Sequence, residues 1–486
     1  MQPQKSIKKN FVMNVILTMS SFIFPLITFP YVSRILGPEG TGKVSLVTSV
    51  IAYFAMFSQL GIPTYGIRAC AKVRDHKEEL SKVTQELFII NTVMGIITYC
   101  VLFVCILTIG KFQQEWLLYL IISTTILFND IGMEWLYKSL EQYSYITIRS
   151  IIFKFVALLL MFLLVRNSED YVMYGAISTF AASASNLLNF INVRKHISFK
   201  KIGDYDFRRH FRPIAIFFGM SCATTVYTNL DNVMLGFMKS DIDVGYYNAA
   251  VKVKSVLLAV VTSLATVLLP RASYYIENGM KKEFFNIANK ALNFVMLVSA
   301  PMTIYFMFFA KESIYLLSGS SFDGAIVPMV VIMPTIIFIG LTNVMGIQML
   351  VPLGKEKAVL VSEIVGAIVD FVLNIIFIPL LGAAGAALGT LAAEIMVFVV
   401  QFIYLNKAVI PGFKSVRYVA IMMGIIVACV VSLPIKQLGL GIFVTLLLSA
   451  SLFFVGYLVV LNVMREPMII EVEKQICMKF KGGKKK

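Results

Sequence analysis

Apolar runs of about 20 residues recur along almost the whole chain, and this feature restricts the fold more than any other. An α-helix needs about 20 apolar residues to cross the hydrocarbon core of a bilayer. Because no water inside that core can bond the backbone, a chain that crosses it must form helices or a closed barrel. The runs are too long and too evenly apolar for barrel strands, which alternate over about 10 residues. The sequence therefore predicts an all-α polytopic membrane protein.

The runs predict about 14 transmembrane helices joined by short loops. Hydrophobic residues make up 58% of the 486 residues and charged residues only 14%, which excludes an ordinary soluble enzyme. The first run follows basic residues, as a signal peptide would, but it lacks a small-residue cleavage site, and we interpret it as a retained helix. The predicted spans are 11–33, 44–66, 84–108, 116–137, 146–166, 171–193, 214–238, 246–269, 287–309, 324–346, 357–380, 382–405, 416–434 and 440–463.

The distribution of positive charge predicts the orientation of these spans. The chain has 43 Lys and Arg against 27 Asp and Glu, a formal net charge of +16. With the N-terminus in the cytoplasm, most Lys and Arg residues fall in the inner segments, as the positive-inside rule requires. We therefore predict N-in and C-in, with anionic membrane lipids and no nucleic acid as the partner of this charge. The basic tail, Lys479–Lys486, is expected to lie at the inner leaflet.

The longest polar stretch in the middle of the chain, residues 194–213, separates two sets of six spans. The two sets resemble each other weakly, and an even number of spans per set predicts parallel repeats about an axis normal to the membrane. Such lobes suit alternating access around a central cavity. The predicted domains are 1–213, an N-terminal six-helix lobe, 214–405, a C-terminal six-helix lobe, and 406–486, which holds two extra transmembrane helices and the basic tail.

Catalytic and metal chemistry have little support in the sequence. The six cysteines show no CxxC spacing and the three histidines no HExxH spacing, so we predict no disulfide framework, no metal site, no cofactor and no catalytic residue. The segment 37–44 nearly matches the phosphate loop GxxxxGK[ST]. Val44, however, replaces the hydroxyl that would bind magnesium, and no strand precedes the segment. We interpret it as a tight turn between the first two spans.

Ionisable residues within the spans are the best candidates for a site, because a charge at membrane depth is costly unless it faces a cavity or a partner. Asp231, with Asn232 beside it, lies in the seventh predicted span, and Lys252 and Lys254 lie in the eighth. An ion pair of Asp231 with one lysine is the structural alternative. The two lysines point to roughly opposite sides of a helix, which would leave one cation for a phosphate-bearing substrate.

Carboxylates in the eleventh and twelfth predicted spans are the candidates for ion coupling. The spacing of Glu363, Asp370 and Asn374 predicts one shared stripe of a helix, and Glu394 lies in the middle of the next span. Carboxylates at this depth are expected to bind a coupling proton or sodium ion, with hydrogen bonding between helices as the alternative. Between them, the glycines and alanines of 382–389 form a small-residue face, which predicts close helix packing.

Three further ionisable residues are expected to reach water. Lys154, in the fifth predicted span, is expected to extend its ammonium group to the inner interface. Asp130 and Glu134 lie near the inner end of the fourth predicted span and are expected to be solvated.

The segment 34–42, RILGPEGTG, resembles the first-hairpin signature of Wzx-type polysaccharide transporters, in the multidrug/oligosaccharidyl-lipid/polysaccharide (MOP) exporter superfamily. Thr41 stands where that family usually has an aromatic residue. Segments 244–250 and 374–387, followed by Glu394, are similar to the family's eighth-span opening and its hairpin of spans 11 and 12. The resemblance covers about residues 5–410. It implies a flippase that moves undecaprenyl-diphosphate-linked oligosaccharides from the inner to the outer leaflet of a bacterial-type cell membrane.

Combined with this resemblance, the charges predict a non-enzymatic transporter for cell-surface polysaccharide such as capsule, exopolysaccharide or O-antigen. Alternating access would be coupled to an ion gradient. The expected partners are the lipid-linked oligosaccharide, membrane lipids, and a polysaccharide polymerase with its chain-length machinery. The residues expected to bind substrate are Lys252, Lys254, Asp231, Asn232, Arg34 and Arg68, and those expected to bind the coupling ion are Glu363, Asp370 and Glu394.

Three other functions remain open at this point. A multidrug or toxin antiporter belongs to the same superfamily, but cations in the eighth span do not suit cationic drugs. A flippase for the peptidoglycan precursor lipid II shares the fold. A membrane-embedded glycosyltransferase or polymerase would need a catalytic acid and usually a large loop outside the membrane, and neither is evident.

Overall fold

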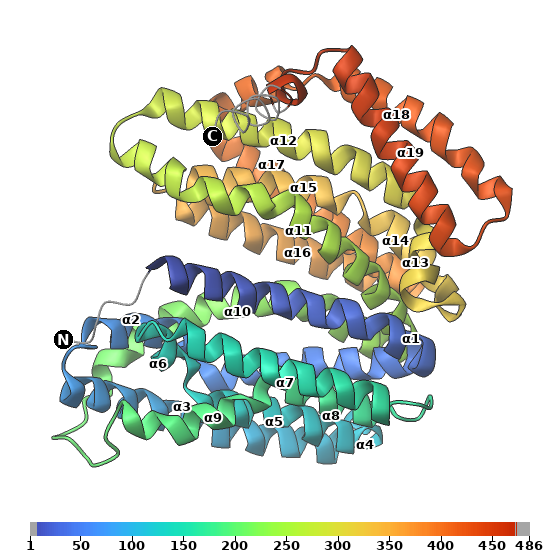
Figure 1. Ribbon diagram of the computed structural model, residues 1–486. Helices are drawn as coiled ribbons and strands as arrows, with labels where there is room; N and C mark the ends of the chain where they lie inside the picture. Colours follow the sequence, from blue (N-terminus) through green and yellow to red (C-terminus); the bar gives the residue numbers. More distant parts are fainter. Residues whose placement is uncertain (1–6, 472, 474–486) are drawn as a thin grey trace, which may run out of the picture. The chain divides into compact units, whose positions relative to one another are not determined.

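The computed structural model describes residues 7–471 and residue 473, and every regular element in these residues is a helix (Figure 1). Nine of the described helices are long and apolar enough to cross a membrane, or ten if the bent pair Ser320–Ile332 and Thr335–Leu350 is one span. The prediction of an all-α polytopic membrane protein is confirmed. The placement predicted for the tail Lys479–Lys486 lies outside the described residues.

The chain folds as two compact units, Met1–Gly245 and Tyr246–Lys486. The helices of the first unit are α1 (Ile7–Gln59), α2 (Ile62–Lys72), α3 (Lys77–Thr108), α4 (Gly110–Gln114), α5 (Trp116–Gly132), α6 (Glu134–Ser139), α7 (Tyr143–Leu164), α8 (Tyr171–Thr179), the π-helix η1 (Phe180–Ala184), α9 (Asn186–Asn192), the 3-10 helix η2 (Val193–Lys195) and α10 (Arg208–Met238).

The second unit begins within α11 (Asp241–Glu277). Its other helices are α12 (Lys281–Phe308), α13 (Ala310–Ser318), η3 (Ser320–Ala325), α14 (Ile326–Ile332), α15 (Thr335–Thr342), the π-helix η4 (Asn343–Leu350), α16 (Glu356–Leu381), α17 (Ala383–Ser415), α18 (Tyr418–Ser432), η5 (Leu433–Leu438) and α19 (Ile442–Val463). The lobe boundaries predicted after residues 213 and 405 stay a prediction, although α10 packs within the first unit.

The number of long apolar helices is lower than the predicted count of about 14 for local reasons. Helix α1 contains the first two predicted spans, because the chain is helical on both sides of a turn at Gly37. Helix α5 has only 17 residues, and the sixth predicted span is divided into α8, η1 and α9. Helix α10, which holds the seventh predicted span, is not among the nine, and the tenth predicted span lies in the bent pair. The exact count and the N-in orientation stay predictions.

The part of α1 before Gly37 and helix α7 run in the same direction, as the first and fifth predicted spans should. Three hydrogen bonds join them at distances of 2.9 Å, and in each the partners are 134 residues apart in sequence. A constant separation means that the two segments advance together, so the contact covers most of α7 but only residues 13–31 of α1. The bonds run from Thr147 to Met13, from Lys154 to Ser20 and from Tyr31 to Val165.

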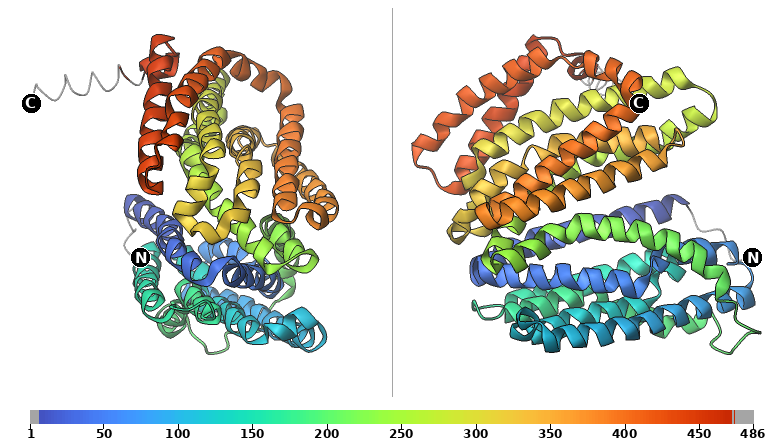
Figure 2. Two further views of the ribbon diagram at one scale, coloured as in Figure 1. Left: turned by 90° about the vertical axis from the view of Figure 1, so that its right-hand side faces the viewer. Right: turned by 180° about the vertical axis from the view of Figure 1, so that it is seen from behind.

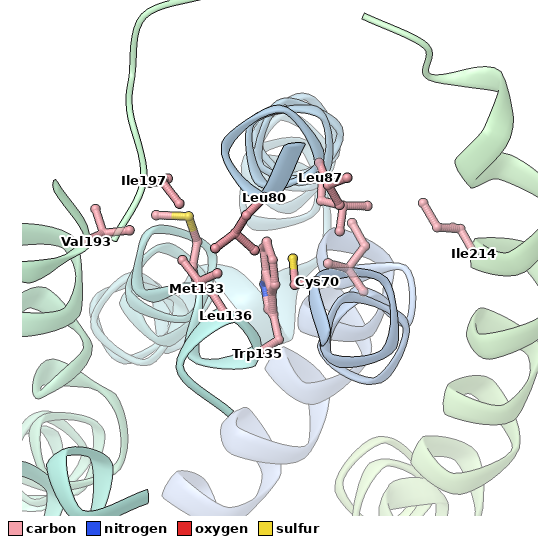
Figure 3. Packing of buried hydrophobic residues seen from close by; sticks show 11 residues of the cluster. Cys70, Leu80, Leu87, Met133, Trp135, Leu136, Val193, Ile197 and Ile214 are labelled. Atoms are coloured by element: carbon pink, nitrogen blue, oxygen red, sulfur yellow. The ribbon is translucent and has the colours of Figure 1, made fainter. Parts of the chain in front are cut away.

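A hydrophobic core joins α2, α3, α6 and the segment around Val193 in the first unit (Figure 3). Trp135 lies at its centre, near Cys70 and Leu80, and is 5% exposed. A Cβ atom added at Gly66 would lie 2.7 Å from the Trp135 ring, so the absence of a side chain at Gly66 lets the indole pack directly on α2.

Helices α18 and α19 form a hairpin that packs on α12 (Figures 1 and 2). The hydroxyl of Tyr457 donates a hydrogen bond to the Leu297 carbonyl oxygen at 2.9 Å, and the Tyr305 hydroxyl lies 2.9 Å from that of Ser449. Buried tyrosines whose hydroxyls are bonded combine apolar packing with a satisfied polar group. These helices therefore belong to the folded body of the second unit.

Candidate functional site

The segment that resembles the first-hairpin signature forms a very close backbone contact within the first unit. Gly37 makes the turn in α1 with φ 66°, a conformation that glycine adopts without strain. Beyond it, a Cβ atom added at Gly42 would lie 1.7 Å from the Asp241 carbonyl oxygen, and one added at Gly245 would lie 2.0 Å from the Pro38 carbonyl oxygen. Two of the recognised sequence segments thus contact each other, and both need glycine at the contact.

Helix α10 continues this contact by running antiparallel to the second half of α1. Gly236 lies against the side chain of Leu46, and the Asn232 Nδ2 atom donates a hydrogen bond to the Ser49 hydroxyl at 2.9 Å. Asp231 is buried beside Asn232. Asn232 therefore joins α10 to α1, and its predicted contact with substrate stays a prediction.

Ion pairs surround the same end of the first unit. The Lys111 ammonium lies 3.0 Å from the Asp241 carboxylate and also donates to the Gly236 carbonyl oxygen. The Lys43 ammonium lies 3.0 Å from Glu115 and 3.3 Å from Glu39. The lysines of this region thus have carboxylate partners.

The cations Arg34 and Arg68 do not lie together. Arg34 is exposed and donates to the Pro30 carbonyl oxygen of its own helix, three residues before the Gly37 turn. Arg68 is exposed on α2, beyond the turn at Gly61. The helix between the two turns is roughly 33 Å long at 1.5 Å per residue, so the two guanidinium groups lie near opposite ends of it.

Helices α16 and α17 form a close antiparallel hairpin in the second unit, as the small-residue face predicted. A Cβ atom added at Gly385 would lie 2.2 Å from the Phe377 carbonyl oxygen. One added at Gly389 would lie 2.3 Å from the Asn374 Oδ1 atom and 2.9 Å from the Asp370 Oδ1 atom. The side chains of Asp370 and Asn374 therefore lie together over Gly389, and both are buried.

Glu363, which was predicted to share their stripe, differs from Asp370 and Asn374 in its burial. The buried residues of α16 advance in steps of four along Ser362, Gly366, Asp370, Asn374 and Ile378. Glu363 is exposed, and Ser362 is buried in its place, with its hydroxyl accepting a hydrogen bond from Gln401 at 3.1 Å. Residues four apart form a row that is inclined to the helix axis. Because α17 packs along the row that contains Ser362, the next residue, Glu363, is left uncovered.

Glu394 lies buried on α17, one turn beyond Thr390. The Thr390 hydroxyl lies 2.9 Å from the Tyr247 hydroxyl, which joins α17 to the beginning of α11. Further along α11, Lys252 and Lys254 are half-buried on either side of the buried Val253. The pairing of Asp231 with one of these lysines stays a prediction.

Asp130 is buried, contrary to the expectation that it is solvated. The Ser58 hydroxyl donates a hydrogen bond to its Oδ2 atom at 2.6 Å. Helix α3 covers the carboxyl group at Gly95, where an added Cβ atom would lie 2.8 Å from the same oxygen. The apolar sequence around Asp130 did not reveal this site, because the covering residues come from two other helices.

Glu134 is half-exposed but is held by two cations. Its carboxylate lies 2.7 Å from the Arg149 guanidinium and 2.9 Å from the Lys138 ammonium. Arg149 is itself buried and donates a second hydrogen bond to the Ser185 hydroxyl at 2.6 Å. The expectation of a freely solvated Glu134 is therefore wrong, since α6, α7 and the end of η1 converge on it.

Comparison with known proteins adds a family and a fold to this geometry. The sequence pattern of the family described as "Polysaccharide biosynthesis protein" matches residues 7–276, and that of the MatE family matches residues 216–376. A putative O-antigen transporter of Escherichia coli (strain K12) is 23% identical over 409 residues, covering 83% of this chain and 98% of that protein. A putative O-antigen transporter of Shigella dysenteriae is 24% identical over 396 residues, covering 80% and 98%.

Two solved structures show a similar fold. The lipid II flippase MurJ in an inward closed conformation has a TM-score of 0.73 and 17% identity, covering 94% of this chain and 100% of that chain. An inward-facing multidrug resistance MATE family transporter of the MOP superfamily has a TM-score of 0.62 and 15% identity, covering 83% and 99%. At these identities the likeness concerns the fold alone.

Proposed function

The chain belongs to the polysaccharide biosynthesis protein family, and from this premise we propose that it flips a lipid-linked oligosaccharide from the inner to the outer leaflet of a bacterial cell membrane. The observation that carries the proposal is the family match over residues 7–276. The nearly complete coverage of two putative O-antigen transporters supports it. The chain is accordingly proposed to be a transporter without catalytic residues, which supplies repeat units to a polysaccharide polymerase and its chain-length machinery.

Alternating access would use the two compact units as its moving bodies. Each unit has its own buried core, and the close helix pairs within each unit resist internal rearrangement. The oligosaccharide and diphosphate are polar and costly to place in hydrocarbon, so protein groups must replace their water during the crossing. The polyprenyl chain is apolar and can stay in the lipid throughout.

The half-buried lysines of α11 are proposed to meet the substrate diphosphate. Replacing Lys252 and Lys254 together with alanine is expected to abolish most glycan export, because the phosphate charges would then lose their counter-charge at membrane depth. Surface glycan measured by immunoblot in a deletion strain that carries the variant tests this prediction. Normal export by a variant present at wild-type abundance would contradict it.

A coupling ion is proposed to bind at the α16–α17 hairpin. Asp370, Asn374 and Glu394 are buried there, and buried carboxyl groups change their net charge when they take up a proton or sodium ion. Glu363 lies exposed on the same helix and stays a predicted ion-binding residue.

Replacing Asp370 with asparagine is expected to lower transport about tenfold, which corresponds to about 1.4 kcal/mol. The replacement is also expected to remove the dependence of transport on the ion gradient. The amide keeps the shape of the carboxyl group and removes its charge. Transport of a fluorescent lipid-linked glycan in proteoliposomes, with and without proton and sodium gradients, measures both effects. Glu356→Gln, at an exposed position of the same helix, is the matched control. Unchanged gradient dependence in Asp370→Asn would remove the carboxylate from the coupling step.

Deleting the gene tests the function as a whole and separates it from its alternatives. The proposal expects loss of a surface glycan and accumulation of its lipid-linked precursor in the inner leaflet. Accumulation of lipid II would instead indicate a peptidoglycan-precursor flippase. Changed drug sensitivity with normal glycans would indicate a multidrug antiporter. Absence of the completed lipid-linked repeat unit would indicate a glycosyltransferase.

A further inference from the structure

Lys154 is a cation in the middle of an apolar helix. It lies 11 residues after Tyr143 and 10 residues before Leu164, which are the first and last residues of α7. At 1.5 Å per residue, both ends of the helix are roughly 15 Å away. Its ammonium group bonds to α1 rather than extending along α7 to an interface, so the expectation of snorkelling is wrong.

The partners of Lys154 are neutral. Its ammonium donates hydrogen bonds to the Ser20 hydroxyl at 2.9 Å and to the Ser21 hydroxyl at 2.8 Å. Both serines direct their own hydrogens to the Leu17 carbonyl oxygen, so each hydroxyl presents its oxygen to the lysine. An ammonium group has three donors, and these two bonds leave one for another acceptor.

The surroundings of Lys154 contain more positive than negative charge. Within the described part of the first unit, no Asp or Glu oxygen lies within 4.0 Å of its ammonium nitrogen. Glu134 is close enough to act on Lys154 electrostatically, but Lys138 and Arg149 already pair with that carboxylate. Within the described part of the first unit, Lys154 therefore has no carboxylate of its own, whereas Lys43, Lys111 and Lys436 each pair with one.

We propose that Lys154, oriented by Ser20 and Ser21, binds the phosphate or diphosphate group of the lipid-linked substrate near the middle of the membrane. This inference rests on the proposed flippase function. A charge at this depth is costly without a counter-ion, and the substrate carries an anion to the same depth when it crosses. Lys154 is half-buried and Ser21 is exposed, so the group is accessible from the surface of the first unit.

The proposed site predicts that Lys154→Gln weakens binding of undecaprenyl diphosphate about tenfold, or by about 1.4 kcal/mol. Glutamine can still bond the serines but carries no charge. Lys154→Arg keeps the charge and is expected to bind within about threefold of wild type, or about 0.7 kcal/mol. Affinity is measured by titration of the full chain in lipid nanodiscs. Lys290→Gln, which changes an exposed lysine in the other unit, is the control and should bind as wild type does.

The choice of probes identifies the source of the phosphate. Undecaprenol, which has no phosphate, should bind equally to wild type and Lys154→Gln. Dioleoylphosphatidylglycerol, added as a competing phospholipid, should not displace undecaprenyl diphosphate from the wild type. Displacement by this phospholipid would overturn the assignment to the substrate, since the site would then accept any lipid phosphate.

A second variant covers the case in which Lys154→Gln does not fold. Ser20→Ala combined with Ser21→Ala keeps the lysine but removes the groups that orient it, and should bind undecaprenyl diphosphate more weakly than wild type does. Unchanged affinity in every folded variant would overturn the inference. The proposed function is judged separately, because it fails only if wild-type protein does not restore glycan export to the deletion strain.

Discussion

Replacing Gly42 or Gly245 with alanine is expected to leave little folded, transport-competent protein. The added Cβ atoms would lie 1.7 Å and 2.0 Å from backbone carbonyl oxygens. A flexible side chain could move aside, but a backbone oxygen cannot move without shifting a helix, so the cost should exceed the roughly 1–3 kcal/mol typical of overpacking. Thermal unfolding of the purified variants in detergent and glycan export in the deletion strain measure the effect.

The control for these variants is a glycine without close neighbours. Gly219 lies in α10, and an added Cβ atom there would meet no atom within 4 Å. Gly219→Ala should therefore fold and export normally, and could even be slightly stabilising because alanine favours a helix. A normal melting temperature for Gly42→Ala or Gly245→Ala would show that the contact at Asp241 and Pro38 is looser than described.

Replacing Glu86 with alanine is expected to destabilise the first unit by about 3 kcal/mol, near the lower end of the cost of breaking a buried ion pair. The Glu86 carboxylate is fully buried on α3. It accepts hydrogen bonds from the Asp206 backbone amide at 2.7 Å and from the Arg209 guanidinium, and its Oε2 atom lies 2.8 Å from the His210 Nε2 atom. His210 is buried, so removing the carboxylate leaves a polar group there without its partner.

The lower end of the range applies because Arg209 is about one-third exposed and can turn to water. The neighbouring Gln85 also attaches the segment 198–206 to α3. Its Nε2 atom donates to the Lys200 carbonyl oxygen at 3.0 Å, and its Oε1 atom accepts from the Tyr205 hydroxyl at 2.9 Å. Glu86→Ala should therefore also make the segment 198–206 more sensitive to limited proteolysis.

Arg74→Ala provides the comparison for Glu86→Ala. The Arg74 guanidinium lies 2.7 Å from Glu141, but both side chains are substantially exposed. An exposed ion pair contributes only about 0.2–1 kcal/mol, so this variant should melt close to wild type. Equal melting temperatures for Glu86→Ala and Arg74→Ala would show that the buried Glu86 carboxylate does not stabilise the first unit.

The small-residue segment shows how far the sequence could predict packing. The glycines of 382–389 predicted a close helix contact, and the contact at Gly385 and Gly389 is present. The sequence could not predict that this packing buries Ser362 and leaves Glu363 exposed, because the two residues are neighbours in the chain. The crossing direction of α17 decides between them, and periodicity along one helix carries no information on it.

The burial of single charged residues was predicted less well, because it too depends on which other helices pack against them. Asp130 is covered by Ser58 and Gly95, and Lys154 is held by Ser20 and Ser21, in each case from helices distant in sequence. Nothing next to Asp130 or Lys154 in the chain signals these neighbours.

The amino-acid sequence by itself determined that this chain is a helical membrane protein and to which family it belongs. The first follows from a local property, since a backbone in hydrocarbon must satisfy its own hydrogen bonds over each run of about 20 apolar residues. The second follows from short sequence segments such as 34–42. Only the tertiary structure decided which charges are buried, paired or open to a ligand. Those properties depend on which helices pack together and at what angle, and that arrangement is set by all the contacts of a unit at once.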